Sequence, residues 1–355
     1  MDAVIAVPVK DEAERIGACL QALARQAEPA AAIVLVINNS GDATADIVRA
    51  TMPGLPVPVH AVEHRFAPEV ASAGAARQMA MERAAALLGE AGVLLCTDAD
   101  GRVPPDWVAA NLHHVRHGAD AVAGRAVLEP AEAALIPAKL HDDDAQECRY
   151  GRLLDEIASV LDPLPWDPWP RHSEHSGASI GVTLAAYRRA GGMEAAPIAE
   201  DRRFFAALER ADARIRHAPE IEVVVSGRTI GRAEGGMADT IRRRLRAADP
   251  YLDDALEPVE QWVRRVTMRG LFRRAWAGET GLASRVADGL GLPDGAVSAA
   301  ARAAFAGEGW AALAAASPLL RRALVPADQV VRAQEAAEAA LNRARSATYV
   351  SVPFT

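Results

Sequence analysis

The first half of the chain alternates short apolar runs with longer segments in which apolar residues recur at helical spacing. This alternation is typical of repeated strand–helix–strand units around a largely parallel sheet. We expect strands at residues 3–9, 33–38, 57–63, 92–97 and 119–127. Helices are expected between them at 11–25, 43–50, 72–88 and 105–117. In such an open α/β domain, ligands bind beyond the carboxyl ends of the strands.

The pattern changes after residue 128. An acidic helical segment within 129–171 leads into a loop at 163–170, whose prolines cannot continue a helix. The later expected elements are a strand at 177–183, a helix at 199–210, a strand at 221–225 and helices from 236 to 345. The expected parts are an α/β half at 1–130, a mixed half of the same domain at 131–235 and a helical C-terminal region at 236–355.

Composition narrows the classes of ligand. Of the 355 residues, 39 are Lys or Arg and 47 are Asp or Glu, which gives a net charge of −8. The chain lacks the basic excess of a general nucleic-acid-binding protein, so we expect no nucleic-acid partner. Lysine occurs only at Lys10 and Lys139, so nearly all positive charge is arginine, whose planar guanidinium suits bidentate contacts with phosphate or carboxylate.

The number and spacing of the cysteines and the lengths of the apolar runs indicate the cellular compartment. Three widely spaced cysteines without a CxxC pair do not form the pattern of a disulfide framework or a zinc site. The apolar run at 3–9 is too short for a signal peptide, and no apolar run approaches the roughly 20 residues that span a bilayer. We expect a cytoplasmic protein, and peripheral contact with a membrane stays open.

Two carboxylates follow the apolar strand that ends at Thr97. Asp98 and Asp100 stand one residue apart in the segment LLCTDADG. Mg²⁺ and similar hard cations take oxygen ligands, commonly one or two protein carboxylates together with phosphate oxygens. The segment therefore indicates a site for Mn²⁺ or Mg²⁺ and a diphosphate. A turn in which both acids only cap the next helix is the alternative.

Several segments resemble family 2 glycosyltransferases with the GT-A fold, in the same order along the chain. IAVPVKDE at 5–12 resembles the first strand of that family and its PxxNE signature. VLVINNSGDAT at 34–44 resembles the second strand and the VDDGSxDxT loop, with Asn in place of both Asp residues. AGAARQ at 73–78 is similar to the GxxxARN helix start, TDAD at 97–100 to the DxD motif, and IAED at 198–201 to the ED motif.

The resemblance covers about two thirds of the chain and implies a Rossmann-like GT-A fold that binds a nucleoside-diphosphate sugar. By this resemblance, Pro8, Val9 and Glu12 would line the nucleotide base and the ribose. Asn38 or Asn39 would meet the edge of the base. The acceptor would be a small molecule, a glycan or a lipid-linked molecule, and the sequence does not choose among them.

The same resemblance implies where the chemistry takes place. Arg77 would lie near the base or the diphosphate, Asp98 would face the ribose and the metal, and Asp100 would ligate the metal. Asp201, preceded by Glu200, would be the catalytic base of an inverting transferase. In physical terms, a bound cation stabilises the charge that develops on a leaving diphosphate, and a carboxylate within hydrogen-bond reach removes the proton of an acceptor hydroxyl.

A second glycine-rich loop follows the expected strand at 221–225. It carries Arg228 and Arg232 in the segment SGRTIGRAEGG. Small residues let the backbone approach a ligand, and guanidinium groups match phosphate oxygens. In a chain with so little lysine, we expect these two arginines to bind the diphosphate, and solvated arginines of a surface loop are the alternative.

Four aromatic side chains stand before the expected strand at 177–183. Trp166 and Trp169, in the proline-rich loop, are candidates for stacking on an acceptor sugar, and packing between domains is the alternative. His172 and His175 are candidates for binding a phosphate, a carboxylate or the metal, and a structural role is the alternative.

Two other functions stay open at this point. A Mg²⁺-dependent phosphatase that resembles the haloacid dehalogenases would use Asp98; that family needs a Lys after its Ser or Thr, and no Lys follows Ser226. A catalytically silent module that binds sugar nucleotides would agree with Asn38 and Asn39, because Asn keeps hydrogen bonding but loses the charge. The helix expected around 258–276 carries Trp and Arg side chains that suit core packing, a membrane surface or a second copy of the chain.

Overall fold

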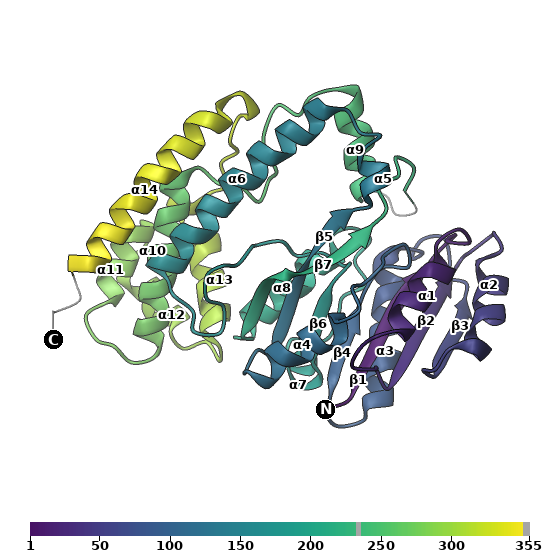
Figure 1. Ribbon diagram of the computed structural model, residues 1–355. Coiled ribbons are helices and arrows are strands. Elements are labelled where there is room, and N and C mark those ends of the chain that lie inside the picture. The colour runs from purple at the N-terminus through teal and green to yellow at the C-terminus, as the bar shows by residue number, and fades with distance from the viewer. Residues whose placement is uncertain (232–235, 351–355) are drawn as a thin grey trace. The chain divides into compact units, whose positions relative to one another are not determined.

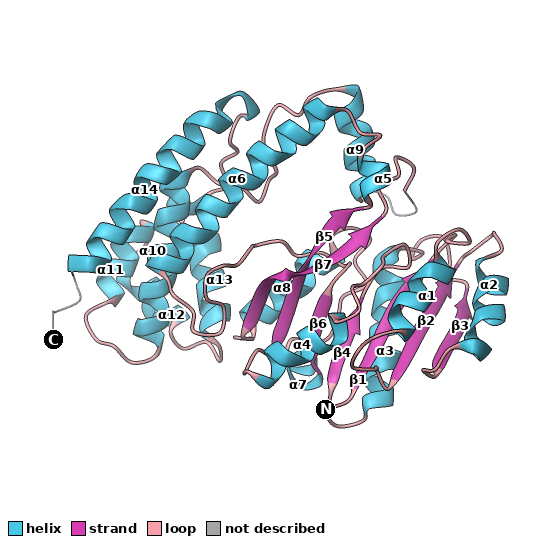
Figure 2. Cartoon of the chain, viewed as in Figure 1, coloured by secondary structure: helices cyan, strands magenta, loops and turns pink. Residues whose placement is uncertain are grey.

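The computed structural model describes residues 1–231 and 236–350, with side chains described up to residue 347 (Figures 1 and 2). The chain divides into two compact units. The first comprises residues 1–136, 174–208 and 213–243, and the second comprises residues 137–173, 209–212 and those from 244 onward. The first unit is built around a sheet and the second from helices.

A mixed sheet forms the centre of the first unit. Over the described residues it has seven strands in the order β3-β2-β1-β4-β6-β5-β7. These are β1 (Ala3–Val9), β2 (Ala32–Asn38), β3 (Val59–His64), β4 (Val93–Cys96), β5 (Ala121–Leu128), β6 (Ile180–Thr183) and β7 (Ile215–Val225). β1 is parallel to β2 and β4, and β5 is parallel to β7, whereas β6 is antiparallel to both β4 and β5. The carboxyl ends of all strands except β6 therefore lie at one edge, which we call the carboxyl edge.

Both faces of the sheet are buried, which is why its strands form nearly continuous apolar runs. Alternate residues of β1 point to opposite cores, Ile5 to one and Val4 to the other. The first core is covered by α1 (Ile16–Ala24), α2 (Thr44–Thr51) and α4 (Trp107–Arg116). The second is covered by α3 (Ala73–Leu88), α7 (Leu184–Arg189) and α8 (Glu200–Arg210).

The second unit packs its helices around two apolar cores. One core lies among α6, α10 and α14 and includes Tyr150 and Leu154, and the other lies among α10 to α13 and includes Phe272 and Leu290. The helices are α6 (Ala138–Leu161), α10 (Val259–Trp276), α11 (Ala283–Leu290), α12 (Asp294–Ala300), α13 (Ala306–Ala316) and α14 (Val330–Val350). Short α5 (Pro130–Ala133) belongs to the first unit, and α9 (Met237–Arg246) spans the boundary.

The expected fold class is confirmed, since an α/β sheet with a mixed second half and a helical C-terminal region is present. Two expected boundaries differ. β7 begins at Ile215, six residues before the expected start, because Arg216 and Glu220 interrupt the apolar pattern of that strand. α6 groups with the C-terminal helices, whereas the sequence grouped it with the mixed half. The division into donor, acceptor and appended parts stays a prediction.

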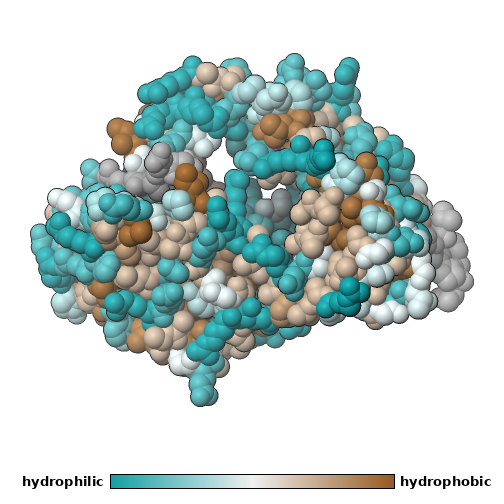
Figure 3. Space-filling view, turned by 180° about the vertical axis from the view of Figure 1, so that it is seen from behind, coloured by the Kyte–Doolittle hydropathy of each residue, from teal (hydrophilic) through white to brown (hydrophobic). Residues whose placement is uncertain are grey.

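The surface of the molecule is mixed in character. On the face seen in Figure 3, hydrophilic and hydrophobic residues alternate, and the most hydrophobic ones form small separate groups. Over the part of the chain that the structure describes, none of the helices combines the length and the apolar character needed to cross a bilayer.

Candidate functional site

The loops after three parallel strands lie next to one another at the carboxyl edge (Figure 1). Ala6 of β1 lies beside Cys96 of β4, and Val9 of β1 lies beside Ile37 of β2. The residues that follow β1, β2 and β4 therefore leave the sheet on the same side. Ligand sites of open α/β sheets form at such an edge.

The loop after β2 holds the loop after β1. The backbone N–H of Glu12 donates to Thr44 Oγ1 at 2.8 Å, and that of Ala13 donates to Asp42 Oδ2 at 3.1 Å. Glu12 is only 5% exposed. The Asp and Thr of the segment GDAT thus position the acid of the first motif, which gives their spacing a structural reason.

The two asparagines after β2 have different surroundings. Asn39 has a positive φ of 50°, which Asn tolerates better than most residues. Its side chain donates to the Phe66 carbonyl at 2.9 Å and accepts from the Phe66 N–H at 3.0 Å. An Asp carboxylate could not donate, so Asn at this position has a physical reason. Asn38 is buried, with its amide 3.5 Å from the Ser72 carbonyl, and the contact of either with a base stays a prediction.

Pro8 and Val9 end the first strand in different environments. Pro8 is half-buried, whereas the Val9 side chain is fully buried in the core under the sheet. A donor at this edge can therefore meet Val9 only through its backbone. The period of the strand turns the Val9 side chain inward, and the prediction that Val9 lines the base and the ribose stays a prediction.

Arg77 joins the residues after β4 to the start of α8. The residue is 4% exposed, and its Nε donates to Glu200 at 3.0 Å. Its Nη2 donates to Asp98 at 2.8 Å and its Nη1 to the Gly177 carbonyl at 3.0 Å. The N–H groups of the guanidinium thus donate to groups of the protein itself. The guanidinium connects two motifs that lie 102 residues apart (Asp98 to Glu200). Direct contact of Arg77 with the donor stays a prediction.

Two glycines make room for this network. A Cβ on Gly177 would lie 2.4 Å from Nη2 of Arg77. A Cβ on Gly74 would lie 2.0 Å from the carbonyl oxygen of Ala196, in the loop that leads into α8. The backbone approaches so closely at both places that only glycine fits without a shift. Sequence reasoning did not find the role of Gly177, although its small neighbours marked a strand start.

Asp201 lies in the first turn of α8, beside the Arg77 network. Its Oδ2 accepts the N–H of Gly177 at 2.8 Å, and its Oδ1 accepts the N–H of Arg202 at 2.7 Å. Ala199, with a φ of 57°, turns the chain into the helix. Asp201 is half-buried, and a carboxylate oxygen has room for more than one donor, so Asp201 can accept a further hydrogen bond from a ligand.

The turn that carries Asp98 and Asp100 is held from two sides. The N–H of Gly101 donates to the Asp98 carbonyl at 3.0 Å, which closes the turn. Arg102 and Val224 exchange two backbone hydrogen bonds, of 2.8 and 3.1 Å, which join the turn to β7. Backbone hydrogen bonds therefore position this turn. The side chains of Asp98 and Asp100 take no part in them and can bind other groups.

Arg228, in the loop after β7, reaches the loops after β1 and β4. Its guanidinium donates to the two carboxylate oxygens of Glu12 at 2.8 and 2.5 Å and lies 3.3 Å from Asp100 Oδ2. Arg228 is thus at the site, although its partners here are acids, and binding of a diphosphate stays a prediction. Arg232 lies outside the described residues.

Glu132 of α5 anchors the loop that carries Arg228. Its Oε2 accepts the N–H of Gly227 at 2.6 Å and the hydroxyl of Ser226 at 3.1 Å, and Arg15 pairs with its other oxygen. Sequence reasoning missed this residue. The only signal was its position in the first turn of a helix that begins with a proline.

The carboxylate oxygens at this turn are suitable ligands for a hard divalent cation such as Mg²⁺. Burial raises the pKa of Asp100 to about 6, the charge of Asp98 acts in the same direction, and Arg228 opposes them. Such mutual repulsion between carboxylates is what a bound cation relieves. Within the described residues, no three His, Cys, Asp or Glu side chains are arranged to hold a metal ion. Asp98 and Asp100 alone would leave most of the coordination shell to phosphate and water oxygens, as Mg²⁺ commonly requires.

The four aromatic candidates are divided between the units. His175 lies in the first unit, with its Nε2 3.0 Å from Nε2 of His217 and its ring stacked on Phe205 at 4.3 Å. His217 was missed because the first residues of β7 were not recognised as a strand. The other three, Trp166, Trp169 and His172, belong to the second unit, and their contact with an acceptor stays a prediction.

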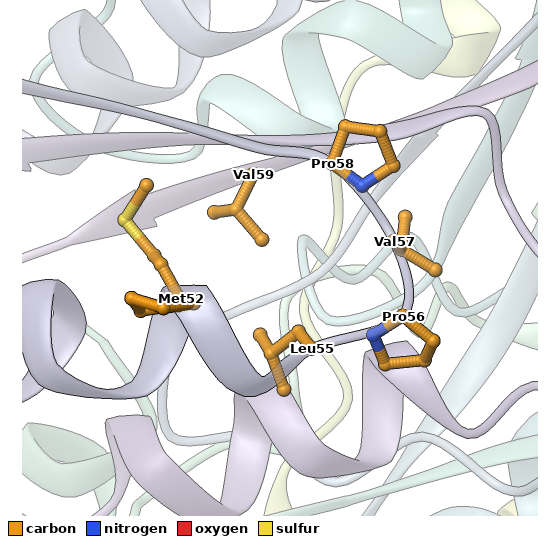
Figure 4. Close-up of a pocket in the computed structure, with 7 residues that line it drawn as sticks. Met52, Leu55, Pro56, Val57, Pro58 and Val59 are labelled. Atoms are coloured by element: carbon orange, nitrogen blue, oxygen red, sulfur yellow. The ribbon is translucent and has the colours of Figure 1, made fainter.

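A surface pocket lies away from these residues. It has a volume of about 470 Å³ and is lined by Met52, Leu55, Val57, Val59 and neighbouring prolines (Figure 4). Val59 is the first residue of β3, so the pocket lies at the amino end of a strand that runs parallel to β2. It is therefore at the opposite end of the sheet from the carboxyl edge and takes no part in the site.

The amino-acid sequence matches one family model. The model described as Glycosyl transferase family 2 matches residues 4–154, which include β1 to β5 with Glu12, Asp98 and Asp100. This segment is similar to family 2 glycosyltransferases. The expected family and enzyme class are thereby confirmed, and Asp201 and Arg228 lie outside the matched segment.

Solved structures resemble this chain at low identity. TarS 1–349 from S. aureus in complex with UDP is 15% identical over 100% of this chain and 93% of that one, with a TM-score of 0.46. This chain covers 50% of the longer TarS chain, at 16% identity and a TM-score of 0.45. The mannosyltransferase PcManGT from Pyrobaculum calidifontis, in complex with GDP-Man and Mn²⁺, is 16% identical over 97% of this chain and 86% of that one, with a TM-score of 0.44. These values are too low to transfer a ligand or a residue role, and no curated protein matches the sequence.

Proposed function

We propose that the chain transfers a sugar from a nucleoside-diphosphate sugar to a hydroxyl group of an acceptor, with a divalent cation and with Asp201 as the general base. One observation carries this proposal. Arg77 bridges Asp98, on the side assigned to the donor, and Glu200, which precedes Asp201. The acid that would face the donor thus shares one buried guanidinium with Glu200, the neighbour of the acid that would activate the acceptor, at the edge where such sheets bind ligands.

The residues of the chain supply three functions in the proposed reaction. Asp201 accepts the proton of the acceptor hydroxyl while the hydroxyl oxygen bonds to the anomeric carbon. The bond from that carbon to the diphosphate breaks, and its electron pair leaves with the diphosphate. Attack from the side opposite to the leaving group inverts the anomeric configuration. The N–H of Gly177 holds one oxygen of Asp201, so the carboxylate keeps its orientation without losing its charge.

The charge of the leaving group requires positive partners. When bound, a Mn²⁺ or Mg²⁺ ion would act as a Lewis acid toward the diphosphate. Asp98 and Asp100 are the residues proposed to hold it, and Arg228 is proposed to bind the diphosphate. Glu12, Asn38 and the backbone near Val9 are proposed to line the nucleoside. In the first unit, His175 is proposed to face the acceptor.

Calorimetry with a panel of UDP-, GDP-, ADP- and dTDP-sugars tests the donor and the cation together. We expect one class of donor to bind, with an affinity that falls at least tenfold when Mn²⁺ is removed. In Asp100→Ala, the affinity should no longer depend on Mn²⁺, whereas Asp46→Ala, an exposed acid on α2, should behave as wild type. Equal affinity of the wild type with and without Mn²⁺ would contradict the assignment of a cation to this site.

The configuration of the product tests the base. If NMR of the product shows that the anomeric configuration is retained, Asp201 is not the base of a single displacement.

A further inference from the structure

Arg228 and Arg77 pair with the acids of the site in different ways. Arg77 has a side-chain exposure of 5% and hydrogen bonds to Asp98, Glu200 and Gly177. The Arg228 side chain is 21% exposed, and its described partners are Glu12 and Asp100, with side-chain exposures of 6% and 18%. Arg77 is therefore enclosed, whereas Arg228 is open to solvent on one side and pairs with the acid proposed to hold the cation.

We propose that Arg228 is an exchangeable internal cation of this site. It balances Glu12 and Asp100 while no divalent cation is bound, and it moves from Asp100 to the donor diphosphate when the cation binds. This inference rests on the proposed function, because it takes Asp100 as a cation ligand and a diphosphate as part of the donor.

The distance between Arg228 and Asp100 favours such an exchange. A cation held by Asp100 would lie about 2.1 Å from a carboxylate oxygen. The guanidinium already lies 3.3 Å from Asp100, so the two positive charges would come within a few ångströms of each other and repel strongly. A diphosphate next to the cation offers the guanidinium a new partner of suitable geometry, because its planar fork matches phosphate oxygens.

The backbone around Arg228 is held, so the exchange is a movement of the side chain. Glu132 binds the N–H of Gly227 and the hydroxyl of Ser226, and the N–H of Arg228 donates to Ser226 Oγ at 3.2 Å. The arginine side chain is long enough to change its partner while its backbone stays in place. Glu12 remains within reach as a second partner and keeps the guanidinium near the site.

Binding of Mn²⁺ alone to the full chain tests the exchange, with free Mn²⁺ followed by electron paramagnetic resonance in the absence of any donor. In Arg228→Gln, we expect Mn²⁺ to bind about tenfold more tightly than in wild type, because a competing positive charge is gone. In the presence of saturating Mn²⁺, the same variant should bind the donor about tenfold more weakly, because the diphosphate loses its guanidinium. A residue with a merely structural role would not move the two affinities in opposite directions.

Arg102→Gln is the matched control. It removes a positive charge two residues from Asp100, but the partner of Arg102 is Glu129, and its side chain is 51% exposed. We expect its Mn²⁺ affinity to stay within about threefold of wild type, because an exposed charge is well screened. Arg228→Lys keeps the positive charge but loses the planar guanidinium that binds two oxygens at once. Its Mn²⁺ affinity should therefore lie between those of wild type and Arg228→Gln.

The inference is overturned if Arg228→Gln binds Mn²⁺ no more tightly than Arg102→Gln. If circular dichroism shows that Arg228→Gln does not fold, Arg228→Met, which also removes the charge, decides: Mn²⁺ binding tighter than wild type supports the exchange, and equal or weaker binding overturns it. The proposed function fails in a different way, by the absence of nucleotide-sugar binding to the wild type, and the comparison of Mn²⁺ affinities does not depend on that result.

Discussion

The carboxyl edge and the helical unit balance their acidic side chains in opposite ways. In the helical unit, Asp162 is 2% exposed and is paired with two arginines of α10, Arg269 at 2.9 Å and Arg273. At the carboxyl edge, acidic side chains are in excess over the arginines that join them. The acids there are Glu12, Asp98, Asp100, Glu200 and Asp201, and the arginines are Arg77 and Arg228.

The difference separates a cluster that joins two helices from the cluster proposed to act on the substrates. A buried carboxylate is costly unless it is paired and hydrogen-bonded. The pair of arginines satisfies Asp162, and the end of α6 is thereby joined to α10. At the carboxyl edge, burial and neighbouring acids raise the pKa of Asp100, so part of the negative charge is left without full compensation. Such a cluster is poised to take up a cation, or a proton from a substrate.

The largest effect is expected on catalysis, from Asp201→Asn at the acidic edge. The rate of sugar transfer should fall about 10²- to 10⁴-fold, because the amide cannot accept the proton. The melting temperature should change little, since the Asn oxygen can still accept the N–H of Gly177. Glu209→Gln, at an exposed position of the same helix, is the control. A variant that keeps more than a tenth of the wild-type rate would remove Asp201 from its role as base.

A smaller effect, on stability, is expected from Asp162→Ala in the helical unit. The free energy of unfolding should fall by about 2–3 kcal/mol, less than for a fully enclosed pair, because Arg269 and Arg273 are partly exposed and can be rehydrated. Denaturation followed by tryptophan fluorescence reports this unit, which holds five of the six tryptophans. Donor affinity should not change. Asp254→Ala, in an exposed pair with Arg322, is the control, and an equal loss in both variants would erase the contrast between the regions.

The smallest effect is expected from Gly177→Ala, which disturbs the Arg77 network by one methyl group. The new Cβ would lie 2.4 Å from Nη2 of Arg77, and the shift needed to relieve this overlap should cost about 1–3 kcal/mol. Gly17→Ala, on α1, is the matched control, because its added Cβ would meet no atom within 4 Å apart from its chain neighbours and the backbone of its own helix. That control should be neutral or up to about 1 kcal/mol more stable, since Ala favours a helix. Thermal unfolding of both variants measures the difference, and equal melting temperatures would show that the network tolerates the methyl group.

Much of the site could be predicted because its acids stand directly after apolar runs. A buried strand is visible as a local pattern, and the residues after it must lie at the edge of the sheet. Asp98 and Asp100 were predicted in this way, and the family resemblance added Glu12 and Asp201. His217 and Glu132 were not found, because neither stands in a local pattern that marks a site.

The acidic partners of the arginines could not be predicted in this way. Arg77 was expected near the donor, and the structure encloses it between Asp98 and Glu200. Arg228 was expected to bind a diphosphate, and its guanidinium binds Glu12, which lies 216 residues away in the chain. Which acid a long side chain meets depends on how distant segments are brought together, and the sequence pattern carries no distances.

The sequence by itself determined the order of strands and helices, the fold class and the acids at the strand ends, because each depends on apolar periodicity and on neighbours along the chain. Only the tertiary structure decided that β6 inserts antiparallel between β4 and β5, and that α6 packs with the C-terminal helices. It also decided which acids are compensated by arginine and which are left with excess charge. These outcomes depend on packing and charge balance between segments far apart in the chain, and such contacts have no local signature.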